Sequence, residues 1–218
     1  MTDLTLRGGA GARIDSEIEV KRSRFLCRMV RVTTEDAARS AIKDARREHY
    51  SARHHCSAFV LGPAAAADQV RRSNDDGEPS GTAGRPMLEA LIGRGFVDCV
   101  AVVTRYFGGT LLGAGGLARA YSDAVLTAID DATVGRLVVQ LERRELFSLS
   151  LAHADAGRVE AELRQRGVTI LGTEYGQSAV LRMAADRADQ LHALVSGITS
   201  GASVPVPIGD EWVDVELS

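Results

Sequence analysis

The sequence is poor in aromatic residues and holds no long apolar run. Only 5% of its 218 residues are Phe, Trp or Tyr, so any core must be built mainly from Ala, Val, Leu and Ile. No apolar stretch approaches the roughly 18 residues that a membrane-spanning helix needs. The N-terminal residues also lack the basic and then apolar layout of a secretion signal. We therefore expect a cytoplasmic protein with no membrane partner.

Cysteine and net charge are also low. The three cysteines, Cys27, Cys56 and Cys99, are widely spaced and odd in number, which predicts reduced, buried thiols and no zinc knuckle. The formal charge of -3 gives no global attraction to nucleic acid or to a membrane. Any contact with nucleic acid would therefore need a local basic patch.

The hydrophobic pattern predicts a mixed α+β protein in two parts. The 45% of hydrophobic residues is enough to form the cores of two small domains. In the first part we expect two strands within 14–32, further strands at 55–61, 69–72 and 97–104, and helices capped by Thr34, opened by Pro86 and centred on Leu117 to Ile129. We expect a linking strand at 137–141. After it we expect six elements in the order strand, helix, strand, strand, helix and strand, at 146–151, 155–166, 168–175, 178–183, 186–197 and 203–215. This βαββαβ order is typical of the ferredoxin-like split motif, so we expect domains at 1–138 and 139–218.

Two glycine-dense loops, residues 73–86 and 104–121, form the main candidate site. Glycines gathered between regular elements indicate left-handed torsions or close backbone approach. If the two loops meet in space, they form one polar surface for a ligand or partner. From the loops and the neighbouring strands we expect this surface to include Arg24, His54, His55, Asp75, Asp76, Glu78, Ser80, Thr82, Arg105, Gly108, Gly109, Gly113, Gly115, Gly116 and Arg119.

Glycines of the second loop admit more than one interpretation. Residues 113–118 match the G-x-G-x-x-A form of the dinucleotide fingerprint, but eight residues separate them from the strand, which does not favour nucleotide binding. Loop amides and the helix start that we expect near Gly116, assisted by Arg105 or Arg119, could instead bind a phosphate or carboxylate. Tight packing of the strand against the helix is the simpler alternative. We expect Gly108 and Gly109 to supply positive φ and to present Arg105 toward the acids at 75–78.

The acids and histidines of these segments are compatible with a metal site but do not require one. Asp75, Asp76 and Glu78 could hold a hard cation or form a solvated acidic turn. His54 and His55 could join them as ligands, although a histidine pair hydrogen-bonded to the acidic loop is the interpretation we favour. Ser80 has no base beside it, so it is not expected to be a nucleophile. We expect no catalytic residue, no metal and no cofactor.

Arginines are concentrated in the first part of the chain, where they could form a stripe for RNA or a phosphorylated partner. They could equally be scattered over solvated faces. Aromatic residues able to stack on bases are limited to Tyr50, Tyr106 and Phe107. The arginines in question are Arg22, Arg24, Arg46, Arg47, Arg53, Arg71 and Arg72.

Four segments, at 21–25, 52–59, 73–84 and 102–121, together resemble the IMPACT/YigZ family. The resemblance implies an N-terminal domain like the second domain of ribosomal protein S5 and a ferredoxin-like C-terminal domain. Eukaryotic members regulate translation, so the resemblance also implies a cytosolic, non-catalytic protein whose partner is RNA, the ribosome or a translation-associated protein. The alternative is a metal-dependent enzyme acting on a phosphorylated substrate, with the acids at 75–78, His54 or His55 as acid/base, and Arg105 as clamp. The oligomeric state is left open.

Overall fold

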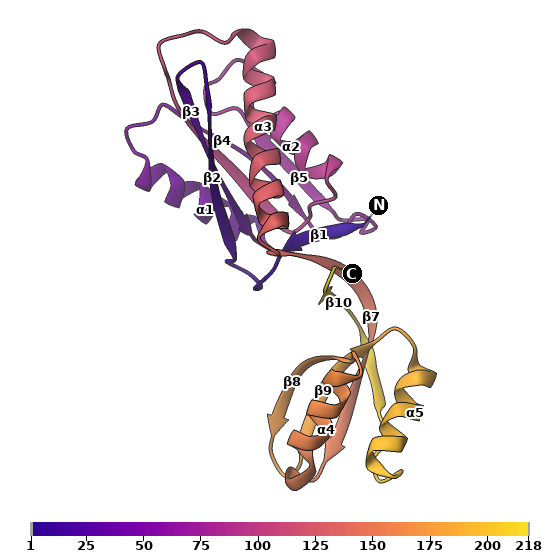
Figure 1. Ribbon diagram of the computed structural model, residues 1–218. Coiled ribbons are helices and arrows are strands. Elements are labelled where there is room, and N and C mark those ends of the chain that lie inside the picture. Colours follow the sequence, from indigo (N-terminus) through magenta and orange to yellow (C-terminus); the bar gives the residue numbers. More distant parts are fainter. Residues whose placement is uncertain (1, 218) are drawn as a thin grey trace. The chain divides into compact units, whose positions relative to one another are not determined.

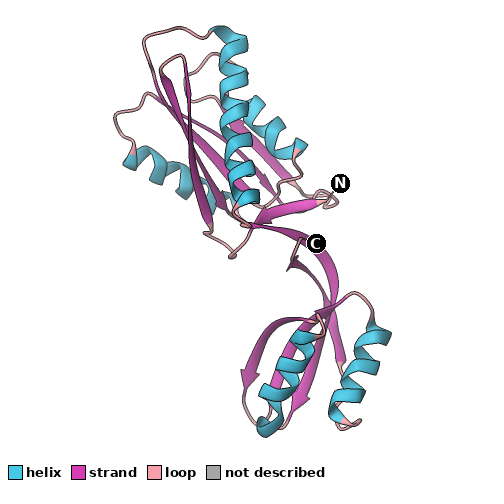
Figure 2. Ribbon diagram, in the orientation of Figure 1, coloured by secondary structure: helices cyan, strands magenta, loops and turns pink. Residues whose placement is uncertain are grey.

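The computed structural model describes residues 2–217, which divide into two compact units. Unit 1 comprises the chain up to Leu141 together with the residues after 215, and unit 2 is Glu142–Val215 (Figure 1). Both units mix helices and strands, in agreement with the predicted α+β class (Figure 2). No helix in the described part of the chain is long and apolar enough to cross a membrane.

Unit 1 is built on an antiparallel five-stranded sheet in the order β2-β3-β6-β4-β5. Helix α1 packs on one face of this sheet, while α2 and α3 cover the other (Figures 1 and 2). A further short strand, β1 (Asp3–Leu6), pairs with the start of β7 (Val138–Leu151). The sheet strands and helices are β2 (Arg13–Val20), β3 (Ser23–Arg31), α1 (Glu35–Glu48), β4 (His54–Leu61), β5 (Val70–Asn74), α2 (Gly84–Gly93), β6 (Cys99–Tyr106) and α3 (Gly113–Val134).

Helix α1 begins and ends as its sequence predicts. Thr34 is the N-cap, and its hydroxyl accepts a hydrogen bond from the Ala37 N–H at 3.2 Å. Arg46 and Arg47 lie in the last turn, where positive charge is favoured by the helix dipole. The small side chains that α1 buries allow it to lie close to the sheet; they are Ala38, Ala41 and Ala45.

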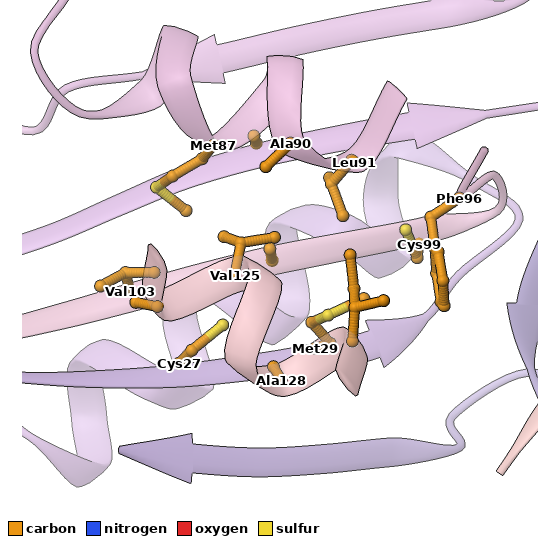
Figure 3. Close-up of a cluster of buried hydrophobic side chains, with 14 of the residues drawn as sticks. Cys27, Met29, Met87, Ala90, Leu91, Phe96, Cys99, Val103, Val125 and Ala128 are labelled. Atoms are coloured by element: carbon orange, nitrogen blue, oxygen red, sulfur yellow. The ribbon is translucent and has the colours of Figure 1, made fainter. Parts of the chain in front are cut away.

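The larger core of unit 1 lies between the sheet and helices α2 and α3. Figure 3 shows Met87 and Leu91 of α2 and Val125 of α3 directed toward sheet residues that include Cys27 and Val103. All three cysteines are buried and none forms a disulfide, which confirms the prediction of buried thiols.

Helix α2 starts two residues earlier than the prediction of a start at Pro86. The reason is a cap supplied from outside the helix. One carboxylate oxygen of Asp75 accepts hydrogen bonds from the N–H groups of Ala83 and Gly84 at 3.0 and 2.8 Å. Pro86 therefore lies in the first turn, where a missing N–H leaves no helical hydrogen bond unmade.

Unit 2 has the element order βαββαβ that its hydrophobic pattern predicts. Its strands lie in the order β10-β7-β9-β8, and its core is formed by one face of the sheet with both helices. The predicted strands at 137–141 and 146–151 prove to be parts of the single strand β7. The remaining elements are α4 (His153–Gln165), β8 (Thr169–Tyr175), β9 (Ala179–Ala185), α5 (Ala188–Thr199) and β10 (Val206–Val215).

Candidate functional site

The two glycine-rich loops meet in space, and Glu78 is the point at which they join. Arg105 donates a hydrogen bond from Nη1 to Glu78 Oε1 at 2.7 Å, and the Tyr121 hydroxyl donates to the same oxygen at 2.8 Å. The side chains of Glu78 and Arg105 are only 4% and 8% exposed. A buried ion pair with a third hydrogen-bonding group therefore connects the loop at 73–86 with the segment at 104–121.

Strand register explains why an arginine enters this part of the core. Arg105 lies opposite Phe25 on β3 and opposite His54 on β4, so its side chain is on the sheet face that α2 and α3 cover. Its guanidinium carbon lies 5.5 Å from the ring centroid of Phe25 and 5.6 Å from that of Phe107. Arginine is attracted to aromatic ring faces at such distances. The Nε atom of Arg105 is buried and has no hydrogen-bond partner among the residues that the structure describes.

A surface hollow of about 660 Å³ lies above this ion pair, and we refer to it as the loop hollow. Phe107 and Leu111 are 54% and 84% exposed, so the hollow presents two large apolar side chains to solvent. Arg53 is also exposed and forms no ion pair with any residue between 2 and 217. The hollow is lined by Ser51, Ala52, Arg53, His54, Glu78, Arg105, Tyr106, Phe107 and Leu111.

Each acid of the predicted cluster is held by donors within the protein. Asp75 accepts hydrogen bonds from three backbone N–H groups, those of Gly81, Ala83 and Gly84. Burial acts to raise the pKa of Asp75, but these three donors outweigh burial and bring the pKa below its ordinary value. Asp76 forms an ion pair with Arg46 and accepts a hydrogen bond at 2.7 Å from the His55 N–H. Across the described residues, no group of three or more His, Cys, Asp or Glu side chains is placed to hold a metal ion.

Both predicted histidines contact the acidic loop or a neighbouring turn. His54 Nδ1 lies 2.9 Å from the backbone oxygen of Asp76, so Nδ1 is the donor. His55 Nε2 lies 3.2 Å from the backbone oxygen of His49. Burial lowers the pKa of His55 and so favours its neutral form. Of the histidine pair that the sequence favours, the His54 ring bonds to the loop at 73–86, whereas His55 bonds to that loop through its backbone N–H and not through its ring.

Gly108 and Gly109 are required for different reasons. Gly109 has φ of 86°, as we expected, but Gly108 does not have a positive φ. A Cβ atom added to Gly108 would lie 2.0 Å from the carbonyl carbon of Arg22 and 2.4 Å from the backbone nitrogen of Ser23. Close backbone approach therefore requires glycine at 108, and a left-handed torsion favours it at 109.

Several predicted residues do not line the loop hollow. Arg24 lies on the opposite sheet face, where it pairs with Glu17 and its guanidinium carbon is 5.8 Å from the Tyr106 ring centroid. Gly115 and Gly116 are helical residues of α3, because the helix begins at Gly113 and not near Gly116. His55, Asp75, Asp76, Gly108 and Gly109, whose contacts are described above, are also outside its lining, which includes His54, Glu78 and Arg105 of the predicted set. The same holds for Ser80, which is exposed, Thr82, whose hydroxyl donates to the Pro79 oxygen, Gly113, which has φ of 70°, and Arg119, which pairs with Asp123.

Leu111 and the role of Tyr121 were missed by reasoning from the sequence alone. Tyr121 fits the apolar stripe of α3, and it is fully buried. A buried tyrosine hydroxyl normally has a hydrogen-bond partner, and this requirement could have indicated a polar group beside it. Leu111 carries no such signal, since its exposure depends on the path of the loop.

Comparison with known proteins identifies relatives of both units. The Impact N-terminal domain model matches residues 21–129, and a domain of unknown function (DUF1949) matches residues 149–202. The chain is 42% identical to the IMPACT family member YvyE of Bacillus subtilis over 75% of its own length and 72% of that protein. It is 39% identical to the IMPACT family member YigZ of Escherichia coli, over 76% of this chain and 79% of that protein. A crystal structure of a hypothetical protein covers 97% of this chain and matches it over all of its own length, with 32% identity and a TM-score of 0.58.

Proposed function

This chain belongs to the IMPACT family, and from that premise we propose that it is a non-catalytic binding protein linked to translation, whose loop hollow binds single-stranded RNA. The link to translation comes from the family resemblance. The choice of RNA comes from the chemistry of the loop hollow. We also propose that the protein acts in the cytoplasm.

The observation that carries the RNA proposal is an exposed aromatic ring in one hollow with an arginine that has no acidic partner among residues 2–217. Proteins that bind single-stranded nucleic acid stack bases on aromatic side chains and contact phosphates with cationic groups. Phe107 and Arg53 both line the loop hollow and supply these two kinds of contact. Tyr50, which is 87% exposed, is close to Arg53 in the chain and offers a second aromatic ring.

The buried ion pair supports the proposal because it fixes the floor of the hollow. A site is more selective when the groups that contact a ligand are held by a rigid layer beneath them. Arg105 contacts Glu78 on one side and the Phe107 ring on the other. The ring that we assign to base stacking is therefore positioned by a side chain that is itself held in place.

For the fold, we propose that unit 1 is related to the second domain of ribosomal protein S5 and that unit 2 is ferredoxin-like. Numbered within unit 2, its strands lie in the order 4-1-3-2, and β9 is antiparallel to both of its neighbours, β7 and β8. Two helices cover one face of that sheet. We retain 1–138 and 139–218 as the proposed domains. The two compact units of the structure meet close to this boundary, at Leu141, and the residues after 215 belong to unit 1.

The test is binding of a fluorescently labelled oligouridine to the full chain, followed by anisotropy at low and moderate salt. We expect binding to weaken as salt rises, because phosphate contacts release counterions. Phe107→Ala should weaken binding by about tenfold or more, the usual cost of losing one stacking contact. Arg53→Ala should weaken it and reduce the salt dependence.

Arg166→Ala is the matched control, since Arg166 is an exposed arginine of unit 2 that pairs with Glu162. It should leave RNA binding unchanged. Equal losses for Arg53→Ala and Arg166→Ala would mean that only net charge matters. Unchanged binding by Phe107→Ala, or no binding at low salt, would rule out the loop hollow as an RNA site.

A further inference from the structure

A second hollow lies between helix α1 and strand β5, and we refer to it as the α1–β5 groove. Its volume is about 430 Å³. Four basic residues line it, Arg39, Lys43 and Arg46 of α1 and Arg72 of β5, against one acidic residue, Glu35; the rest of the lining is Ile42, Phe59, Ser57, Ser73 and Asn74. It does not share any lining residue with the loop hollow.

The sequence places these basic residues on the same side of the sheet. Positions 39, 42, 43 and 46 follow the three- and four-residue spacing of one helix face. On β5, Arg72 lies opposite Phe59 of β4, and Phe59 belongs to the core that α1 covers. Arg71 therefore points to the opposite face of the sheet, because side chains alternate along a strand.

The groove carries an excess of positive charge. Arg39 is paired with Glu35 and Arg46 with Asp76. Lys43 and Arg72 have no acidic partner in the part of the chain that the structure describes. A partner with negative charge would therefore find two unneutralised cations on opposite walls, above an apolar floor.

Strand β5 ends the sheet, and among residues 2–217 it pairs with no strand other than β4. An unpaired strand edge offers backbone donors and acceptors to an added strand. Exposed aromatic rings for base stacking do not line this groove, unlike the loop hollow. These features favour an extended peptide over a nucleic acid.

We propose that the α1–β5 groove is a docking site for an extended acidic segment of a partner protein. The segment adds as a strand to the free edge of β5. Its acidic side chains, at alternate positions, all lie on the face that α1 covers, where their carboxylates face Lys43 and Arg72 and their methylene groups contact Ile42 and Phe59. This site is separate from the loop hollow, so either proposal can fail without the other.

The test uses the full chain and a labelled probe peptide of alternating glutamate and valine, with anisotropy as the readout at physiological salt. We expect saturable binding that Arg72→Glu and Lys43→Glu each weaken by about tenfold, as reversal of a contacting charge should. Arg71→Glu is the matched control: it introduces the same charge change on the same strand but on the opposite face. It should change affinity by less than about twofold, since salt screens charges that are not in contact.

Two further probes, a proline-containing peptide and oligouridine, test strand addition and the choice of a peptide over a nucleic acid. A peptide with proline in place of alternate valines keeps the charge but loses backbone donors, so it should bind at least about tenfold more weakly. Equal binding of that peptide would overturn strand addition. The proposal would also be overturned if Arg71→Glu and Arg72→Glu weakened peptide binding equally, or if binding of the peptide were not saturable. It would be overturned too if oligouridine bound more tightly than the peptide and Arg72→Glu abolished that binding. Circular dichroism melts of every variant would establish that the protein is folded in each assay.

Discussion

Removing Arg105 is expected to destabilise unit 1 by about 3–5 kcal/mol, the cost of leaving a buried charge without its partner. Glu78 is 4% exposed, and after the substitution Arg105→Ala only the Tyr121 hydroxyl would donate to its carboxylate. The guanidinium contacts with Phe25 and Phe107 would be lost as well. The free energy of unfolding of an ordinary domain is about 5–15 kcal/mol, so this loss would be a large part of it. Urea denaturation followed by circular dichroism would measure the change.

A double-mutant cycle distinguishes the ion pair from simple loss of packing. Glu78→Gln keeps an acceptor for Tyr121 but leaves the cation of Arg105 buried without a counter-charge, so it should also be strongly destabilising. The double variant Arg105→Leu with Glu78→Leu removes both charges and should cost at least about 2 kcal/mol less than the sum of the corresponding single changes.

Arg24→Ala is the control for this cycle, because Arg24 forms an exposed ion pair with Glu17 on the opposite sheet face. It should leave the urea midpoint nearly unchanged. Additive costs at Arg105 and Glu78 would refute the reasoning, since two independent sites have no coupling energy. A small cost for Arg105→Ala alone would do so as well.

Three other predictions concern the loops and α1, each measured by urea or thermal denaturation. Gly108→Ala should cost more than about 3 kcal/mol, because its Cβ would overlap the Arg22 backbone, whereas Gly109→Ala should cost about 1–2 kcal/mol for its left-handed torsion. Asp75→Asn should cost about 1–2 kcal/mol at pH 7, since its amide nitrogen cannot accept the backbone donors. Because the folded-state pKa of Asp75 is lowered, its contribution is complete above the ordinary value of 3.8 and is lost as the pH falls further, so the two proteins should converge in acid. Thr34→Ala should cost about 1 kcal/mol through loss of the N-cap.

Local signals in the sequence were enough to predict much of unit 1. Alternation of polar and apolar residues at 14–32 indicated two strands, and the structure has β2 and β3 there. Thr34 and the alanine stripe after it predicted α1, since both the cap and the buried face depend on residues within the helix or next to it. Such elements are predictable because their determinants lie in one short segment.

Features that depend on distant residues were not predictable in the same way. Helix α2 starts at Gly84 because Asp75, nine residues away, supplies its cap. Strand β1 is short, and it exists because Leu6 pairs with Val138, far along the chain. Neither contact leaves a periodic pattern in the sequence.

At the candidate site, the sequence predicted that the two glycine-rich loops meet, but not which side chains contact one another. Asp75, Asp76 and Glu78 are similar residues within one short loop, yet they have different partners. Backbone N–H groups hold the first, Arg46 and the His55 N–H hold the second, and Arg105 with Tyr121 holds the third. Which acid meets Arg105 is decided by the path of the loop, and a spacing of one or two residues does not encode that path.

These contacts change which residues a partner can use. An acid whose oxygens already accept hydrogen bonds from the protein would have to lose those hydrogen bonds before it could bind a cation or a substrate. That loss would also remove the cap of α2 or break the buried ion pair. The exposed side chains of the loop hollow can bind a partner without breaking such contacts. Arg53 has no acidic partner within residues 2–217, and the side chains of Phe107 and Leu111 are largely in solvent. The surface that we propose for a partner is therefore cationic and aromatic, while the acids of the loop at 73–86 hold the loops in place.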